Sequence, residues 1–212
     1  MVSFVTPCPP DIQEKIKSIA GESVSRETFL KLETYLSFLE KENKKYNLVG
    51  PGEIDRLWDR HVLDSAQLLP FVKQGSLGFL DVGSGAGFPG VVLSLLGAQG
   101  GCLVEASRKK CSFLENVSRE TGAEFSVLNV RVEELRGRAF EKIVSRALAP
   151  IGTSLGWTQK ICSPATQWIF LKGKTVDVEI EEARKSFSFD VEMYPSLTNP
   201  EGRIVRLQNI FF

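Results

Sequence analysis

Residues 79–90 read Phe-Leu-Asp-Val-Gly-Ser-Gly-Ala-Gly-Phe-Pro-Gly (FLDVGSGAGFPG), and this stretch decides the fold. Its first four residues are mostly apolar and suit a buried parallel strand. The glycines that follow suit a turn with positive φ and close approach of a ligand, and Pro89 suits the first turn of a helix. Strand, glycine turn and helix in this order are the sequence form of a Rossmann-like binding site for a nucleotide-type cofactor.

The glycines fit two spacings. The residues from Gly85 onward match the dinucleotide pattern G-x-G-x-x-G, but the strand ends at Val82, and counting from there makes Gly83 the first turn glycine and gives G-x-G-x-G. Asp81 then lies at the strand tip, where a carboxylate would repel a pyrophosphate and favour the amino and sulfonium groups of S-adenosylmethionine (SAM). We therefore expect SAM, bound by Asp81, Gly83 and Gly85. A dinucleotide and a tight turn without any ligand are the alternatives.

The composition limits the class of protein. The chain has 212 residues, enough for one domain of about 140 residues and a smaller appendage. Its 26 basic and 26 acidic side chains balance, so any polyanion must bind to a local basic face. The four cysteines lack C-x-x-C spacing and a nearby histidine, which argues against a zinc site or a disulfide scaffold. No apolar run has the roughly 18 residues of a membrane helix, and residues 1–10 lack a signal-peptide pattern, so we expect a cytoplasmic monomer without metal or membrane segment.

The first third of the sequence has a helical pattern. Apolar residues recur at helical spacing before and after a capping Ser25, and again over residues 53–72. A polar break follows at residues 74–76, so we divide the chain into a helical region, residues 1–72, and an α/β domain, residues 73–212. One polar face of the 53–72 helix carries Arg56, Arg60, Asp64 and Gln67.

Strand and helix patterns alternate through the rest of the chain, as parallel strands joined by crossover helices require. A final pair of strands follows the last helix. This order is similar to the class I SAM-dependent methyltransferase sheet, which is mostly parallel with one antiparallel strand near the C-terminus. The predicted strands cover residues 78–82, 102–105, 124–129, 142–145, 167–171, 187–194 and 203–210.

Ligands of open α/β sheets lie beyond the carboxyl ends of the strands, so the residues that end each strand are candidates for the site. Glu105 ends the second strand about 20 residues after the glycine turn, where a carboxylate can accept both ribose hydroxyls of an adenosine. After the third strand, Glu133 and the backbone around Val132 are available to an adenine, and Arg131 can face a phosphate. An exposed acidic strand end without any ligand is the alternative for Glu105.

The end of the fourth strand discriminates among methyl-transfer chemistries. It lacks the Asn/Asp-Pro-Pro-aromatic motif common in enzymes that methylate exocyclic amines, and no cysteine is placed there as the nucleophile that carbon methylation needs. It carries Arg146, which cannot act as a base at neutral pH. A ring nitrogen already presents a lone pair, so its methylation needs in-line positioning and electrostatic tuning rather than deprotonation.

Several short blocks together resemble the bacterial glucose-inhibited division protein B family, the small-subunit ribosomal RNA guanine-N7 methyltransferases. Their order and spacing carry the resemblance, which covers roughly residues 40–208. The blocks are Tyr46-Asn47-Leu48, Trp58-x-Arg60-His61-x-x-Asp64-Ser65, the loop from Asp81 to Gly90, Arg131-Val132-Glu133, Ser145-Arg146-Ala147 and Lys172-Gly173.

The resemblance implies SAM-dependent methylation of a guanine N7 in 16S ribosomal RNA near the decoding region, with that RNA or the assembling 30S subunit as partner. It maps the cofactor contacts onto Gly83, Phe88, the Val132-Glu133 pair and Arg146, which we also expect to be catalytic. Glu105 is added from the strand-end argument alone.

The product guanine is cationic, so we predict that the Asp64 carboxylate assists catalysis. Arg60, His61, Arg131 and Lys172 are predicted to contact RNA, because half or more of protein–nucleic acid contacts go to the backbone. His61 is the chain's one histidine, and a hydrogen-bonded role at the junction of the two regions is its alternative. Two other functions stay open from the sequence: a SAM-binding ribosome-assembly or regulatory module without turnover, and a nicotinamide-dependent oxidoreductase.

Overall fold

The predicted strands form one seven-stranded sheet in the order β3-β2-β1-β4-β5-β7-β6. Strands β1 to β5 pair in parallel, and β7 pairs antiparallel with both β5 and β6. The expected methyltransferase-type sheet with one antiparallel strand is therefore confirmed. The computed structural model describes residues 7–21, 24–73, 78–137 and 139–212. The strands are β1 (Phe79–Val82), β2 (Gly101–Val104), β3 (Phe125–Leu128), β4 (Lys142–Arg146), β5 (Gln167–Lys172), β6 (Ser188–Pro195) and β7 (Arg203–Phe211).

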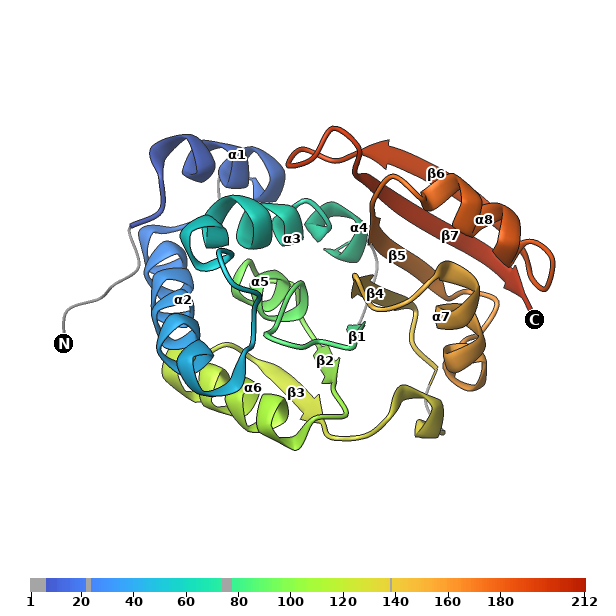
Figure 1. The fold of residues 1–212 in the computed structure, drawn as a ribbon, viewed down its shortest axis with the longest axis horizontal. Helices are drawn as coiled ribbons and strands as arrows, with labels where there is room; N and C mark the ends of the chain where they lie inside the picture. The colour runs from blue at the N-terminus through green and yellow to red at the C-terminus, as the bar shows by residue number, and fades with distance from the viewer. Residues whose placement is uncertain (1–6, 22–23, 74–77, 138) are drawn as a thin grey trace.

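Helices cover both faces of the sheet (Figure 1). The α-helices are α1 (Pro10–Ala20), α2 (Arg26–Tyr46), α3 (Asp64–Ala66), α4 (Leu69–Lys73), α5 (Gly90–Leu95), α6 (Arg108–Thr121), α7 (Ile151–Thr158) and α8 (Val176–Ala183). The 3-10 turns are η1 (Ile54–Arg56), η3 (Val132–Glu134) and η4 (Gln159–Ile161), and η2 (Leu57–Leu63) is a π-helix.

Neighbouring residues of each strand point to opposite faces and join two hydrophobic clusters. Phe79 and Val144 belong to the cluster under α1 to α6, whereas Leu80 and Ile143 belong to the cluster under α7 and α8. Because both faces are covered, the inner strands are mostly apolar on both faces, and Asp81 of β1 and Lys142, Ser145 and Arg146 of β4 are the polar exceptions.

The N-terminal helices share the first cluster with the sheet. Phe38 of α2 stacks on Phe113 of α6 with ring centroids 5.4 Å apart. Ser25 caps α2 as predicted, because its Oγ accepts the Thr28 N–H at 3.2 Å. Helices α1 to α4 therefore form part of the covering layer of one sheet face. Within the described residues, no helix has the length and apolar character that a membrane span requires.

The single helix predicted over residues 53–72 is wrong. The segment is divided into η1, the π-helix η2, α3 and α4, with Gln67 and Leu68 in a turn between the last two. Pro70 supplies a physical reason for that break, since it has no N–H to continue the α-helical ladder from α3. The predicted break at residues 74–76 lies outside the described residues.

Candidate functional site

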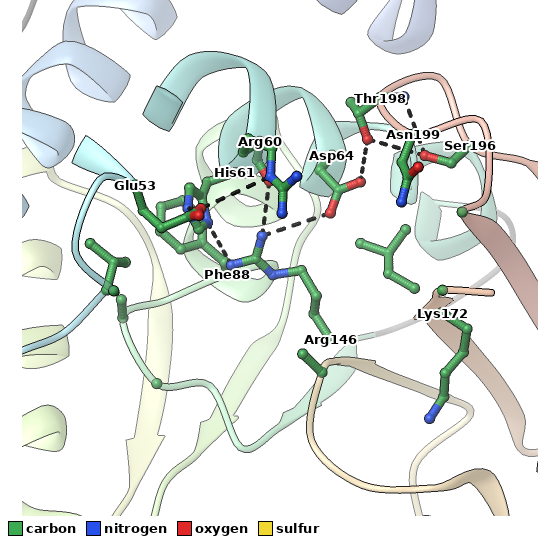
Figure 2. A pocket seen from close by; sticks show the side chains of 18 of the residues that line it. Glu53, Arg60, His61, Asp64, Phe88, Arg146, Lys172, Ser196, Thr198 and Asn199 are labelled. Atoms are coloured by element: carbon green, nitrogen blue, oxygen red, sulfur yellow. Dashed lines mark hydrogen bonds and ion pairs between the residues drawn. The ribbon is translucent and has the colours of Figure 1, made fainter. Parts of the chain in front are cut away.

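A cavity of ≈ 480 Å³ opens at the carboxyl ends of β1, β4 and β5, where ligands of such sheets bind. The N-terminal helical region and the loop between β6 and β7 close its other sides (Figure 2). Its lining comprises residues 48–50, Glu53, Arg60, His61, Asp64, residues 83–86, Phe88, Arg146, Ala147, residues 171–173, Ser196, Thr198, Asn199, Gly202 and Arg203.

The glycine turn forms one rim of the cavity. Gly83, Gly85 and Gly87 all have positive φ, and a Cβ on Gly83 would lie 2.4 Å from a methyl carbon of Leu148. The fully buried Tyr35 donates its hydroxyl to the Ala86 carbonyl at 2.7 Å, which ties the turn to α2. The backbone of residues 83–86 is thus fixed where a ligand can approach it closely.

Asp81 lies beneath this turn, outside the cavity lining. Its side chain is buried, and one carboxylate oxygen accepts the Gly90 N–H at 3.0 Å while the other has no hydrogen-bond partner among the described residues. Burial raises the pKa of Asp81 to about 7. Asp81 therefore anchors the start of α5 and can act on a ligand through its field across the turn.

Glu105 binds the glycine turn from the end of β2. Its two carboxylate oxygens accept the N–H groups of Gly85, at 3.0 Å, and of Ser107, at 2.8 Å. It does not line the cavity, and neither do Val132, Glu133 and Arg131, which lie at the end of the adjacent β3. The residues expected to contact the adenosine thus lie along the sheet edge beside the cavity. The other expected cofactor contacts, Gly83, Gly85, Phe88 and Arg146, line the cavity itself.

Arg146 is the centre of the cavity's charge network. Its Nη1 donates to the Arg60 carbonyl at 3.0 Å and lies 3.7 Å from an oxygen of Asp64, and its guanidinium carbon lies 5.0 Å from the centroid of the Phe88 ring. Figure 2 shows this guanidinium between His61 and Asp64. Arg146, at the end of β4, thus lies beside Asp64, the carboxylate of the N-terminal region that is predicted to assist catalysis.

His61 belongs to the same network, and its tautomer follows from its partners. Arg146 Nη2 lies 2.7 Å from His61 Nδ1, and because a guanidinium only donates, Nδ1 accepts. The ring proton is then on Nε2, which donates to Glu53 at 2.8 Å. Burial, with the Arg146 charge, lowers the pKa of His61 to about 4, so the ring is neutral near pH 7.

Asp64 lies at the opposite end of the network and is half-buried. One of its oxygens accepts the Thr198 hydroxyl at 2.6 Å and the Gln67 amide at 2.9 Å. Burial raises the pKa of Asp64, and the hydrogen bond from Thr198 and the Arg146 charge oppose that shift.

Lys172 lines the cavity, but its ammonium group points away from Asp64 and Thr198 (Figure 2). It donates to the Ala149 carbonyl at 2.5 Å and to Glu179 of α8 at 2.7 Å. Arg60 has about half of its side chain exposed and Arg131 is exposed, so these two cations have the accessibility that a phosphate contact needs.

The sequence argument did not identify Glu53, or the loop residues from Ser196 to Asn199, as site residues. Glu53 resembles an ordinary acidic residue at the start of a helix, and the loop is far from the other site residues in sequence. The one available signal was the polar face shared by Arg60, Asp64 and Gln67. The described residues contain no cluster of three or more His, Cys, Asp or Glu side chains suited to a metal ion.

Comparison with known proteins identifies the family. Residues 29–205 match the model of the GidB family, described as rRNA small subunit methyltransferase G. The chain belongs to this family. The family resemblance seen in the sequence is thereby confirmed, methyl transfer to small-subunit ribosomal RNA follows as its activity, and the oxidoreductase alternative is set aside.

Curated GidB-family relatives match nearly the whole chain. The ribosomal RNA small subunit methyltransferase G of Paramagnetospirillum magneticum is 40% identical over 192 residues, which cover 91% of this chain and 94% of that protein. The protein of the same name from Rhodospirillum rubrum is 41% identical over 191 residues, 90% of this chain and 95% of its own length.

Solved structures with low identity share the fold of this GidB-family chain. The ribosomal protein L11 methylase of Lactobacillus delbrueckii subsp. bulgaricus superposes with a TM-score of 0.57 at 17% identity, covering 69% of this chain and 77% of its own. The glycopeptide N-methyltransferase MtfA, solved with SAM, gives a TM-score of 0.59 at 10% identity, covering 70% of this chain and 93% of its own. The sheet is therefore that of class I methyltransferases.

Proposed function

We propose that this protein transfers a methyl group from SAM to N7 of a guanine in 16S ribosomal RNA near the decoding region, acting in the cytoplasm as a monomer. Family membership supports methyl transfer to small-subunit ribosomal RNA. The proposal that a ring nitrogen receives the methyl group rests on the side chains that line the cavity, and above all on the hydrogen bond from Arg146 to Nδ1 of His61.

The residues present fit SAM as the methyl donor. The cavity has the size of a small-molecule site, and the backbone of Gly83 and Gly85 lines it; the space beside Gly85 is open, since a Cβ added there would lie 3.8 Å from the Gly83 carbonyl oxygen. SAM would supply an electrophilic methyl group on a sulfonium centre. We propose that Gly83, Gly85, Phe88 and Arg146 hold its methionine side, with Asp81 acting through its field. The proposed adenosine contacts are Glu105, Val132 and Glu133.

The charge network offers no strong base for a substrate proton. Arg146 stays protonated at neutral pH, and the basic nitrogen of His61 is already occupied by Arg146. A guanine N7 needs no such base, since its lone pair is available, so these residues can act by orientation and electrostatics alone. The reaction leaves the base cationic, and the Asp64 carboxylate lies in the cavity to stabilise that charge.

Four side chains are proposed to form the RNA-binding surface: Arg60, His61, Arg131 and Lys172. Arg60 and Arg131, with accessible side chains, are suited to backbone phosphates. His61 and Lys172 bond to neighbours inside the protein, so their proposed part is to shape the surface against which the nucleotide lies.

Nucleoside mass spectrometry of 16S ribosomal RNA from cells with and without this chain tests the proposal. The expected result is one N7-methylguanosine that disappears with the gene and returns with the wild-type chain. Methylation at another atom of the RNA would refute the N7 assignment, and unchanged RNA with intact SAM binding would favour an assembly or regulatory module without turnover.

A further inference from the structure

The loop between β6 and β7 forms the cavity wall opposite the glycine turn. Ser196, Thr198, Asn199 and Gly202 line the cavity, and the side chains of the first three lie beside Asp64 in Figure 2. The loop connects the two strands at the far edge of the sheet, so sheet pairing alone does not set the position of its tip.

Gln67 attaches this loop to the N-terminal helical region. Its side-chain oxygen accepts the Leu197 N–H at 3.0 Å, and its amide nitrogen donates to Ser196 Oγ at 3.2 Å and to Asp64 at 2.9 Å. Because the oxygen is bound to a backbone N–H, the orientation of the amide is determined. Gln67 is only 4% exposed, which makes an unpaired amide costly at this position.

Two further contacts reinforce this attachment. The Thr198 hydroxyl donates to the same Asp64 oxygen that accepts from Gln67, at 2.6 Å. At the base of the loop, Phe71 of α4 packs edge-on against Tyr194 of β6 with ring centroids 5.0 Å apart. The loop therefore has one defined position relative to Asp64 and, through Asp64, relative to Arg146.

We propose that Gln67 is a positioning residue for the transfer reaction: it fixes the 196–202 loop and the Asp64 carboxylate relative to each other, so that together they form the wall that holds the target base. Gln67 acts through these groups and does not line the cavity itself. The inference rests on the proposed function for the identity of that base as guanine. It does not depend on which base atom receives the methyl group.

Replacing Gln67 by methionine tests the proposal, because methionine fills a similar volume without donors or acceptors. Gln208→Met is the matched control, since Gln208 lies on β7 outside the cavity lining and also donates from its amide, to Glu192 at 3.2 Å. The measurements are kcat and KM for methyl incorporation into small-subunit ribosomal RNA, SAM affinity by calorimetry, and thermal unfolding.

For Gln67→Met we expect kcat/KM for the RNA to fall about 10- to 100-fold, since small misplacements of positioning groups have effects of this size. SAM affinity should stay within about twofold of wild type, because the glycine turn is untouched, and Gln208→Met should keep wild-type kcat/KM. An unchanged kcat/KM, or a loss of SAM affinity as large as the loss of kcat/KM, would overturn the positioning role.

Thr198 provides an independent variant in case Gln67→Met does not fold. Thr198→Val removes the hydroxyl bond to Asp64, and Thr198→Ser retains it. We expect a fall in kcat/KM for the valine variant and recovery for the serine variant, with the double variant Gln67→Met/Thr198→Val less impaired than the product of the single effects. Equal activity of Thr198→Val and wild type contradicts the proposal.

The two proposals fail in different ways. If methyl incorporation responds to Gln67 as expected but mass spectrometry places the methyl on another atom, the guanine-N7 assignment is wrong and the positioning role stands. If N7-methylguanosine forms at the wild-type rate in Gln67→Met and in Thr198→Val, the positioning role is wrong and the function stands.

Discussion

Nη2 of Arg146 lies 2.7 Å from Nδ1 of His61, and the proton in that hydrogen bond belongs to the guanidinium. The one histidine of the chain is therefore an acceptor that orients a cation. Glu53 completes the arrangement by accepting the other ring N–H. A carboxylate, a neutral imidazole and a guanidinium thus follow one another from the N-terminal region to the end of β4.

Arg146→Ala should reduce methyl transfer to small-subunit ribosomal RNA by at least about 100-fold, the scale seen when one preorganised electrostatic group is removed from an active site. The change removes the cavity's central cation and leaves His61 Nδ1 and the nearby Asp64 without it. Steady-state methyl incorporation measures the loss.

Arg206→Ala is the matched control for that variant. The Arg206 side chain is 20% exposed, against 19% for Arg146, and it also pairs with a carboxylate, Glu192, but outside the cavity lining. Its kcat/KM should equal that of wild type. Wild-type turnover by Arg146→Ala would show that the proposed catalytic role is wrong.

His61→Gln should remove one pH-dependent contribution to the free energy of unfolding. The pKa of His61 is about 4 in the folded protein, against an ordinary value of 6.5, so between these pH values the unfolded chain binds a proton that the folded chain does not. The contribution of this residue is fully present above about pH 6.5 and is lost as the pH falls toward 4, by on the order of 1 to 3 kcal/mol. Glu53, Arg60 and Arg146 face the ring and set this shift.

Denaturant unfolding of wild type and of His61→Gln between pH 4 and pH 6.5 measures this contribution as the difference between their free energies of unfolding. Glutamine does not titrate, and the chain has no second histidine to obscure the result. The free energy of unfolding of wild type relative to the variant should fall as the solution is acidified. Parallel curves would exclude a neutral, buried imidazole.

Asp81→Asn should have the opposite pH signature. The pKa of Asp81 is about 7 in the folded protein, against an ordinary value of 3.8, so this group makes wild type less stable as the pH rises through that interval. The asparagine variant should gain about 1 to 3 kcal/mol relative to wild type between pH 4 and pH 8. If the Asp81 field favours the SAM ammonium, calorimetry will also show weaker SAM binding by the variant. A variant that is equally less stable at both pH values would refute the titration.

Gly87→Ala should destabilise the protein more than the same substitution at another glycine with positive φ. Gly87 has φ +102, and an added Cβ would lie 2.5 Å from a Val91 methyl, so backbone strain adds to overpacking, each about 1 to 3 kcal/mol. Gly122→Ala is the control, because φ there is +66 and no atom lies within 4 Å of the added Cβ. We expect lower stability and at least about tenfold weaker SAM binding for Gly87→Ala only; similar SAM affinities of the two variants would contradict a role of this turn in binding.

Local patterns predicted the sheet well because strand periodicity, glycine turns and caps are properties of neighbouring residues. The strand-end rule likewise predicted that Arg146 and Glu105 lie at the carboxyl edge of the sheet, since topology alone brings strand ends to one edge. The same rule indicated Asp81 as a direct cofactor contact, whereas its side chain lies under the turn and bonds to Gly90.

Tertiary pairings were beyond such rules. The bond from Arg146 to His61 spans 85 positions and that from Thr198 to Asp64 spans 134, and no local pattern encodes either. Glu53 is recognisable as a site residue only from its position in the cavity lining and its hydrogen bond with His61. The division of residues 53–72 into π-helical and α-helical turns depends on packing as much as on Pro70.

The attachment of the 196–202 loop to Gln67 also has a consequence for biosynthesis. Chains emerge from the ribosome N-terminus first, so the glycine turn and Arg146 are made well before the loop residues 196–198 that bond to Asp64 and Gln67. A nascent or truncated chain ending before residue 196 would contain the residues proposed to hold SAM and lack one wall of the cavity. If the proposed role of this loop holds, the ability to hold the target base is acquired last, when the loop after β6 bonds to Asp64 and Gln67.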